Sequence, residues 1–204
     1  MQSEKIVKEK LIIEAAQKRF GLFGIEKTSM REIADDLNLS KASLYYYFPD
    51  KANLYRAVVE KEQAEFIERI LERILRIREA DMLLREYSRS RLSYFRTLLN
   101  LSRLRLEAYS SLMPVLKDTI SSFKEKEKEI IVKIINKGIA DSIFFIEDPE
   151  QAAELFLDLL KGLRISILND KKSLIIEQEE YERLLEKTNS FTDMYIRGLR
   201  FHTL

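Results

Sequence analysis

The chain has 204 residues, 46% of them hydrophobic and 34% charged, with a formal net charge of +1 at pH 7. It has no cysteine and a single histidine, so a thiolate nucleophile, a disulfide framework and cysteine-ligated zinc are excluded. Only 5 Gly and 3 Pro interrupt it, which favours long helices over many short strands.

Neither a membrane span nor an export signal is expected. No segment approaches the roughly 18 consecutive apolar residues that a membrane-spanning helix needs. The first residues mix charges of both signs and lack a long apolar run, unlike a secretory signal. We therefore expect a cytoplasmic protein that has no membrane partner.

Helical periodicity covers nearly the whole chain. The first predicted helix spans residues 5–21, and glycines follow it. Thr28 or Ser29 then offers an N-cap for a short helix that ends near Leu37, and Ser40 offers the next cap. The later predicted helices are 41–48, 51–77, 81–100, 103–112, 117–140, 150–169 and 173–201, with breaks at Pro49, Pro114 and Pro149.

Residues 28–48 have the spacing of a helix-turn-helix, two short helices joined by a tight turn. Ala34 is small enough for the helices to approach closely. Asn38 stands where the turn is expected to need a positive φ, which asparagine tolerates better than most residues. This arrangement leaves the outer face of the second helix free to enter a major groove of DNA. The expected contacts between the helices come from Ile33, Leu37, Leu39 and Leu44.

The outer face of the second helix is the predicted DNA-reading surface. Its tyrosine hydroxyls can donate hydrogen bonds to phosphates, and the ring edges can contact thymine methyl groups. Lys51, at the start of the next helix, is placed to hold a phosphate. Pairs of short helices also occur in proteins that never bind DNA, so the pattern alone leaves a structural role open. The outward residues are Lys41, Ala42, Ser43, Tyr46 and Tyr47.

Charge does not decide between these readings. Residues 1–50 carry eight basic and eight acidic side chains, so this segment is neutral overall. DNA binding therefore depends on where the cations lie. The lysines near the start of the chain, Lys5, Lys8 and Lys10, could line the same side as Lys41 and Lys51.

The segment IIEAAQKRFGLFGIEKTSMREIADDLNLSKASLYYYFPDKANLYRAVV, residues 12–59, resembles the TetR family of one-component transcriptional regulators. Many of its positions fall on the family pattern in one register. Three positions differ from the family pattern. Arg19 stands where an apolar residue is usual, Asn38 replaces the usual turn glycine, and Tyr47 replaces a frequent histidine. These departures leave the fold prediction unchanged and the operator sequence open.

The resemblance implies an all-α protein with two parts. An N-terminal three-helix DNA-binding domain is expected over residues 1–50. A larger C-terminal helical domain for ligand binding and dimerisation is expected over residues 51–204. The implied function is a ligand-responsive transcriptional regulator, expected to be a repressor, that binds a palindromic operator as a homodimer and is released by a small-molecule effector. The sequence leaves repressor versus activator open.

The resemblance also assigns roles to individual residues of the helix-turn-helix. The helix from Lys41 would read bases, while Tyr45 and Lys51 would grip phosphates. Contacts to the DNA backbone near the start of the preceding helix would come from Thr28, Ser29 and Arg31.

The last two helices are the implied dimer interface. Residues 138–168 resemble the family's turn into its first dimer helix, and their apolar stripe is typical of a helix that needs a partner. Pairing two such helices across a two-fold axis would form a four-helix bundle. A monomer core is the alternative. The predicted interface residues are Phe156, Leu159, Leu160, Leu163, Leu184, Phe191, Met194 and Tyr195.

The sequence says least about the ligand. A set of aromatic and apolar residues in the middle of the chain could line a pocket for an apolar or amphipathic effector, although for any single residue ordinary core packing is the favoured explanation. Arg85, Arg89, Arg96 and Arg103 could form a basic stripe, either solvated or specific for an anion such as an acyl-CoA. The candidate pocket residues are Tyr87, Tyr94, Phe95, Leu98, Tyr109, Met113, Phe123 and Phe144.

An enzyme is the rival class of function. His202 lies three residues from the end of the chain, a poor place for a catalytic base or metal ligand. The sequence has no phosphate-binding glycine loop, and no cofactor or metal site is expected. A DNA-binding dimer without ligand control remains the second alternative.

Overall fold

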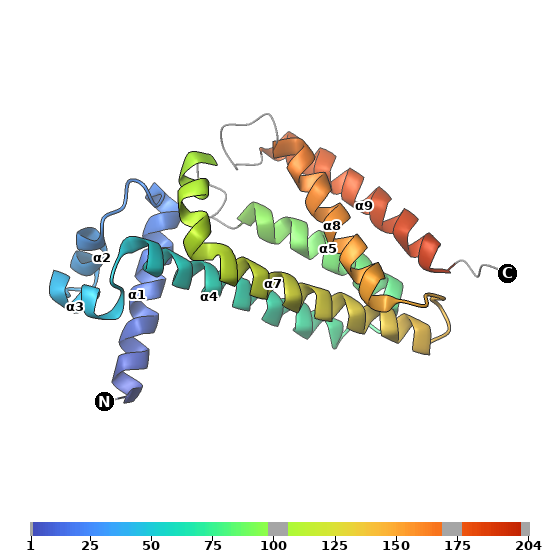
Figure 1. Cartoon of the computed structure of the whole chain (residues 1–204), viewed down its shortest axis with the longest axis horizontal. Coiled ribbons are helices and arrows are strands. Elements are labelled where there is room, and N and C mark those ends of the chain that lie inside the picture. The colour runs from blue at the N-terminus through green and yellow to red at the C-terminus, as the bar shows by residue number, and fades with distance from the viewer. Residues whose placement is uncertain (1, 98–105, 169–176, 201–204) are drawn as a thin grey trace. The chain divides into compact units, whose positions relative to one another are not determined.

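The computed structural model describes residues 2–97, 106–168 and 177–200, and within them it contains helices and turns but no strand (Figure 1). The predicted all-α class is confirmed. No helix within these ranges combines the length and the apolar character needed to cross a bilayer. The predicted pocket residue Leu98 and the single histidine, His202, lie outside the described residues.

The first compact unit contains α1 (Gln2–Phe23), α2 (Met30–Asp36), α3 (Lys41–Tyr47), the part of α4 up to Ala64 and the part of α7 up to Ile120. Its core is a cluster of buried apolar side chains from all five helices. The expected domain end at residue 50 lies inside this unit, because α4 packs its first turns into the same core. The α4 residues concerned are Leu54, Tyr55, Val58 and Val59.

The second unit contains the rest of α4 (Lys51–Ile74), α5 (Ala80–Thr97), the later part of α7, α8 (Pro149–Leu168) and α9 (Gln178–Arg200). Helix α9 packs against both α5 and α8. An aromatic cluster closes the packing of α8 on α9, where the Phe156 ring lies 4.6 Å from Tyr195 and 5.8 Å from Phe191, centroid to centroid.

Helix α7 (Leu106–Ala140) continues through Pro114, where a break was predicted. A proline inside a helix removes one backbone hydrogen bond and crowds the preceding turn. Here tertiary packing outweighs that local preference, because Leu112 and Leu116, on either side of the proline, are both buried in the core of the first unit. The predicted separation into helices 103–112 and 117–140 is therefore wrong.

Pro149 starts a helix, as its fixed φ allows at the first helical position. The Asp148 side chain accepts a hydrogen bond from the backbone N–H of Gln151 at 3.0 Å and so caps α8. The break predicted at this Asp-Pro pair is confirmed, and the capping aspartate explains its position.

Gly138, near the end of α7, leaves room for a buried ring. A Cβ built there would lie 2.1 Å from the ring of Phe144, which is almost fully buried. We expect Gly138→Ala to lower the free energy of unfolding by about 1–3 kcal/mol, the usual effect of overpacking a core. Gly162→Ala, where a Cβ meets nothing within 4 Å, is the matched control and should be neutral or stabilising. Equal effects of both variants in denaturant unfolding would contradict this packing.

Candidate nucleic-acid interface and ligand pocket

The turn between α2 and α3 has the predicted geometry. Asn38 adopts a φ of 53°, and the N–H of Leu39 donates to the carbonyl of Ala34 at 2.9 Å. Ile33, Ala34 and Leu44 are buried between the helices. The positive φ predicted for the asparagine is confirmed, and it accounts for a residue other than glycine at this turn.

The start of α2 is closed by a capping box. The Ser29 hydroxyl accepts from the N–H of Glu32 at 3.2 Å, while the Glu32 carboxylate accepts from the Ser29 hydroxyl and N–H, each at 2.7 Å. Both hydrogen bonds that the Glu32 carboxylate accepts lower its pKa, and the bond from the Ser29 hydroxyl has the larger effect. Ser29 is thus an N-cap in the described structure, and a DNA contact from it stays a prediction.

The three residues expected near the start of α2 differ in where they point. Thr28 is only 2% exposed, and its hydroxyl donates to the Gly24 carbonyl at 2.9 Å, so it faces the fold. Arg31 extends into solvent, with 82% of its side chain exposed and Asp35 at 3.8 Å. A DNA contact from Arg31 stays a prediction, and its extended side chain is compatible with one.

Arg19 joins α1 to α2, a role that sequence reasoning missed. Its guanidinium hydrogen-bonds both carboxylate oxygens of Asp36, one at 2.8 Å, and lies 3.5 Å from Glu32. The hydrogen bond from Arg19 lowers the pKa of Asp36. An arginine at a usually apolar position of α1, with two adjacent acids on α2, was the available signal.

The outer face of α3 presents its tyrosines unequally. Tyr46 is 73% exposed, Tyr45 is exposed to a lesser extent, and Tyr47 is half-buried against the core. Lysines lie over two of the rings. The Lys41 ammonium is 5.6 Å from the Tyr45 centroid, and the Lys5 ammonium of α1 is 5.5 Å from that of Tyr46.

The remaining predicted residues of this face differ in exposure. Lys41 and Ala42 are exposed, and Ser43 is half-buried, with its N–H donating to the Ser40 hydroxyl that caps the helix. The exposed surface of α3 and the start of α1 therefore combine cations, phenol hydroxyls and a methyl group, as a base- and phosphate-contacting surface requires.

Lys51 has partners that the sequence did not indicate. Its ammonium donates to the carbonyls of Ile25 at 2.7 Å and Thr28 at 2.9 Å, which holds the chain between α1 and α2 against the start of α4. An ammonium has three donors, so these two bonds leave one for a phosphate. The predicted phosphate contact is compatible with this anchoring role.

Lys51→Met separates the two roles. We expect a loss of about 1.5–3 kcal/mol in unfolding free energy, because hydrogen bonds from a charged group are removed. We also expect the slope of log affinity against log salt to fall by about 0.9, the value for one phosphate contact. Denaturant unfolding and a salt series on random duplex DNA measure these two quantities. An unchanged slope would remove the phosphate role and leave only the anchor.

Neither described pocket contains more than one of the predicted pocket residues whose side chains the structure describes. Tyr87, Phe123 and Phe144 are buried in the core of the second unit, and Met113 belongs to the first unit. The position of the Tyr109 side chain is outside what the structure describes. Of the set, Tyr94 and Phe95 alone are seen to line a described pocket, and they line different ones.

Tyr87 belongs to a buried polar cluster that the sequence did not reveal. Arg91 of α5 forms two hydrogen bonds to Glu127 of α7, at 2.6 and 3.2 Å, and the Tyr87 hydroxyl donates to the same carboxylate at 2.5 Å. Burial raises the pKa of Tyr87 well above its ordinary value. Burial alone would lower the pKa of Arg91, but the charge of Glu127 raises it on balance.

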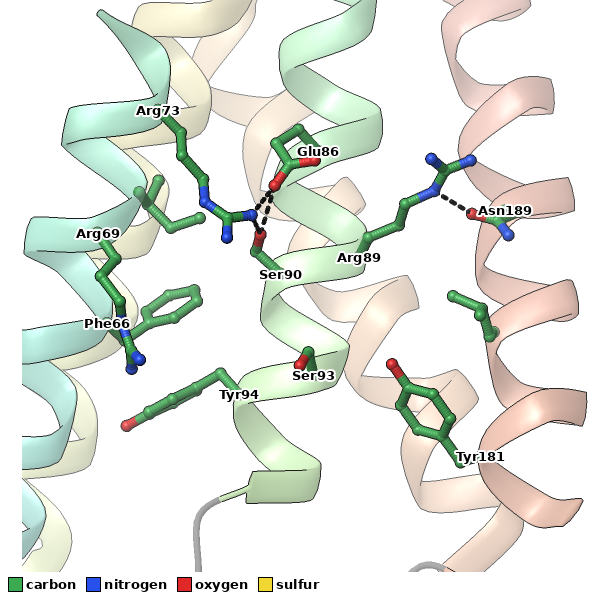
Figure 2. Close-up of a pocket in the computed structure, with 12 residues that line it drawn as sticks. Phe66, Arg69, Arg73, Glu86, Arg89, Ser90, Ser93, Tyr94, Tyr181 and Asn189 are labelled. Atoms are coloured by element: carbon green, nitrogen blue, oxygen red, sulfur yellow. Dashed lines mark hydrogen bonds and ion pairs between the residues drawn. The ribbon is translucent and has the colours of Figure 1, made fainter. Parts of the chain in front are cut away.

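The larger described pocket lies over the exposed face of α5, between α4 and α9, with a volume of about 540 Å³ (Figure 2). We call it the α5 pocket. Arg73 reaches from α4 to the Glu86 carboxylate and to the Ser90 hydroxyl, the latter at 2.7 Å. On the other side of α5, Arg89 donates to Asn189 of α9 at 3.0 Å. The lining is Phe66, Arg69, Ile70, Arg73, Glu86, Arg89, Ser90, Ser93, Tyr94, Tyr181, Leu185 and Asn189.

Three arginines of the predicted stripe are on α5 and bind side chains of α9. Arg85 pairs with Asp193, Arg89 bonds Asn189, and Arg96 bonds Gln178 while lying 4.1 Å from the Tyr181 ring centroid. These three arginines therefore connect α5 to α9 in the described structure. Arg103 lies outside the described residues.

The predicted dimer residues divide by exposure. Phe156, Leu160 and Leu184 are buried within the second unit, so a partner helix cannot reach them. Leu163, Phe191 and Tyr195 are half-buried, and burial raises the pKa of Tyr195, whose hydroxyl donates to the Ala152 carbonyl at 2.7 Å. Leu159 and Met194 are exposed, as are Leu155 and Ile165, which the prediction omitted.

Comparisons with known proteins agree with this architecture. Residues 12–58 match the sequence profile described as "Bacterial regulatory proteins, tetR family". Over 54 residues the chain is 43% identical to the transcriptional regulator RutR of Escherichia coli strain K12, covering 26% of each chain. The alignments span about a quarter of the length of the curated relatives.

Solved structures extend the similarity to nearly the whole chain. The crystal structure of a transcriptional regulator from Cytophaga hutchinsonii is 39% identical, with a TM-score of 0.85 over 95% of this chain and 99% of that one. A regulator from Saccharomonospora viridis in complex with choline shares the fold, at 19% identity and a TM-score of 0.63 over 91% of this chain and 95% of that one. The chain therefore belongs to the TetR family, whose members are transcriptional regulators and not enzymes.

Proposed function

We propose that this chain is a ligand-responsive repressor that binds a palindromic DNA operator through α3. The observation that supports this most directly is the exposed face of α3, where Tyr46 is 73% exposed beside Lys5 of α1. The ring is held on a rigid helix-turn-helix, so little ordering is needed when it enters a major groove. Tyr45, Lys41 and Arg31 then provide the phosphate contacts that position it.

A homodimer is the form that reads a palindrome. Two copies related by a two-fold axis place their α3 helices about 34 Å apart, one turn of DNA. The exposed apolar residues of α8 and α9 are the proposed interface, because exposed apolar side chains are often covered by a partner subunit. They are Leu155, Leu159, Ile165 and Met194.

Effector control is proposed to act through α4. This helix begins with Lys51, which holds the turn before α2, and its later residues Arg69 and Arg73 line the α5 pocket. A ligand that binds one position of α4 better than another shifts the population between DNA-binding and released forms. That a regulator of the same fold is known in complex with choline supports a small-molecule effector for this chain.

The alternative is a DNA-binding dimer without ligand control. A pocket filled by core side chains would favour it, whereas the α5 pocket is open to solvent and lined by both polar and apolar side chains. We therefore prefer the ligand-controlled form.

A reporter in a heterologous bacterial host tests the proposal. A promoter that overlaps the protein's preferred DNA site should lose most of its output when the chain is produced. Tyr46→Ala, produced at the same level, should restore it. If the promoter output stayed unchanged while the protein occupied its DNA site, or if the output increased, the protein would not be a repressor.

A further inference from the structure

We infer that the α5 pocket binds a small organic anion, a carboxylate, sulfonate or phosphate attached to an aromatic or aliphatic body. This deepens the proposed function, since the anion would be the effector. Three arginines and one glutamate line the pocket, a net charge of +2. Its volume of about 540 Å³ lies within the range of about 300–1,000 Å³ for small-molecule sites.

Two of these arginines are not neutralised by a carboxylate among the described residues. Arg69 donates through Nε to the backbone carbonyl of Glu65 at 3.1 Å, and Arg89 donates to the amide oxygen of Asn189. Both bonds use Nε and neutral acceptors. Each guanidinium has five donors, so each keeps its charge and its terminal nitrogens for an anion.

The single acid of the pocket is already occupied. The Glu86 carboxylate accepts from Arg73 and from the Ser90 hydroxyl. A cationic ligand would meet uncompensated arginines and would have to compete with Arg73 for this carboxylate. The charge distribution therefore selects an anion over a cation such as choline.

An apolar surface continues from the cations. The rings of Phe66 and Tyr94 are stacked, with centroids 4.4 Å apart, and with Ile70 they form an apolar floor that is almost fully buried. Tyr181 and Leu185, also in the lining, are half-buried and stay accessible. Figure 2 shows the Tyr181 ring on the opposite side, pointing from α9 toward α5. A free inorganic phosphate would leave the accessible faces of Tyr181 and Leu185 uncovered, whereas an anion with an apolar body would bury them.

The placement of the arginines also suggests how a bound anion would change the position of α4. Arg69 is on α4, Arg89 is on α5 and Tyr181 is on α9, so one bound molecule contacts three helices (Figure 2). Figure 2 shows Arg69 and Arg89 on opposite sides of α5, so an anion bound by Arg69 would favour the α4 position that keeps this contact.

A pair of fluorescent probes tests the inference directly on the purified protein. Anilinonaphthalene sulfonate carries an aromatic body and a sulfonate, and phenylnaphthylamine carries the same body without the charge. We expect one sulfonate probe per chain, bound about tenfold or more tightly than the neutral analogue. Equal affinity for the two probes would overturn the requirement for an anion.

Charge variants locate the site. Arg69→Gln combined with Arg89→Gln should weaken the sulfonate probe about tenfold or more and leave the neutral probe unchanged. Both side chains are exposed, so the fold should persist, which circular dichroism checks. Arg183→Gln with Arg197→Gln, two exposed arginines of α9 outside the pocket, removes the same net charge and should leave both probes unchanged. Equal weakening by both double variants would overturn the site.

DNA binding is measured separately, so the two proposals can fail independently. Specific DNA binding together with charge-independent probe binding would leave the regulator and remove the anion site. Arginine-dependent probe binding without specific DNA binding would keep the anion site and remove the regulator. If both hold, the sulfonate probe should lower DNA affinity in wild type and not in Arg69→Gln/Arg89→Gln.

Discussion

Glu127→Gln is expected to lower the free energy of unfolding by about 3–5 kcal/mol, because it leaves the Arg91 guanidinium buried without its counter-charge. The Glu127 side chain is 3% exposed and that of Arg91 10%, so water cannot replace the lost carboxylate. The Tyr87 hydroxyl also loses a charged acceptor. For a chain of this length the midpoint of thermal unfolding should fall on the order of 10 °C.

Two further variants show whether the charge is the cause. Glu129→Gln removes an exposed acid from the same helix and should change stability by less than about 0.5 kcal/mol. The triple variant Tyr87→Phe/Arg91→Met/Glu127→Leu removes the whole polar cluster and should recover most of the stability, since an apolar replacement leaves no charge buried. A small effect of Glu127→Gln, or no recovery in the triple variant, would contradict the role of the ion pair.

Tyr46→Ala is expected to weaken binding to the preferred operator about 10- to 100-fold, the effect of losing a contact worth about 1–3 kcal/mol to a base pair. Affinity for random duplex DNA should stay within about twofold, because the phosphate contacts that carry sequence-independent binding remain. Fluorescence anisotropy on labelled duplexes measures both affinities.

Neighbouring substitutions refine this result. Tyr46→Phe removes the hydroxyl and keeps the ring, so it separates a hydrogen bond from an apolar contact to a base. Tyr45→Ala should weaken operator and random DNA by similar factors, because the implied contact of Tyr45 is to phosphate. If Tyr46→Ala lowered both affinities equally, Tyr46 would be a phosphate contact or a structural residue.

The helix-turn-helix could be predicted because its determinants are local. A small residue at Ala34, a turn residue that tolerates positive φ at Asn38 and a cap at Ser40 each act within a few residues along the chain. The exposed ring of Tyr46 followed from helical spacing once Leu44 was assigned to the core. In such a segment the sequence neighbours are also the structural neighbours.

What could not be predicted depends on contacts between distant segments. Lys51 bonds carbonyls more than twenty residues earlier, and Arg91 meets Glu127 from another helix. A helix break was predicted at Pro114 because proline disfavours the interior of a helix. The burial of the leucines on either side of it, which outweighs that preference, cannot be seen in the sequence.

The lining of a pocket also depends on contacts between distant segments. An aromatic side chain that faces a core and one that faces a ligand have the same helical spacing, so Phe123 and Tyr94 could not be distinguished. Three of the four arginines of the stripe, Arg85, Arg89 and Arg96, lie on α5, but what they do depends on α9. Arg85 and Arg96 now connect to that helix, and Arg89 lies at the edge of the α5 pocket.

Selection of random duplex DNA on the purified protein, followed by sequencing of the bound fraction, tests the central claim most directly. We expect enrichment of an inverted repeat whose half-sites lie about one helical turn apart, 10–10.5 base pairs centre to centre. We also expect the Tyr46→Ala variant to lose this enrichment while still retaining DNA at low salt. No enrichment by a folded wild-type dimer freed of bound small molecules would contradict a sequence-specific regulator.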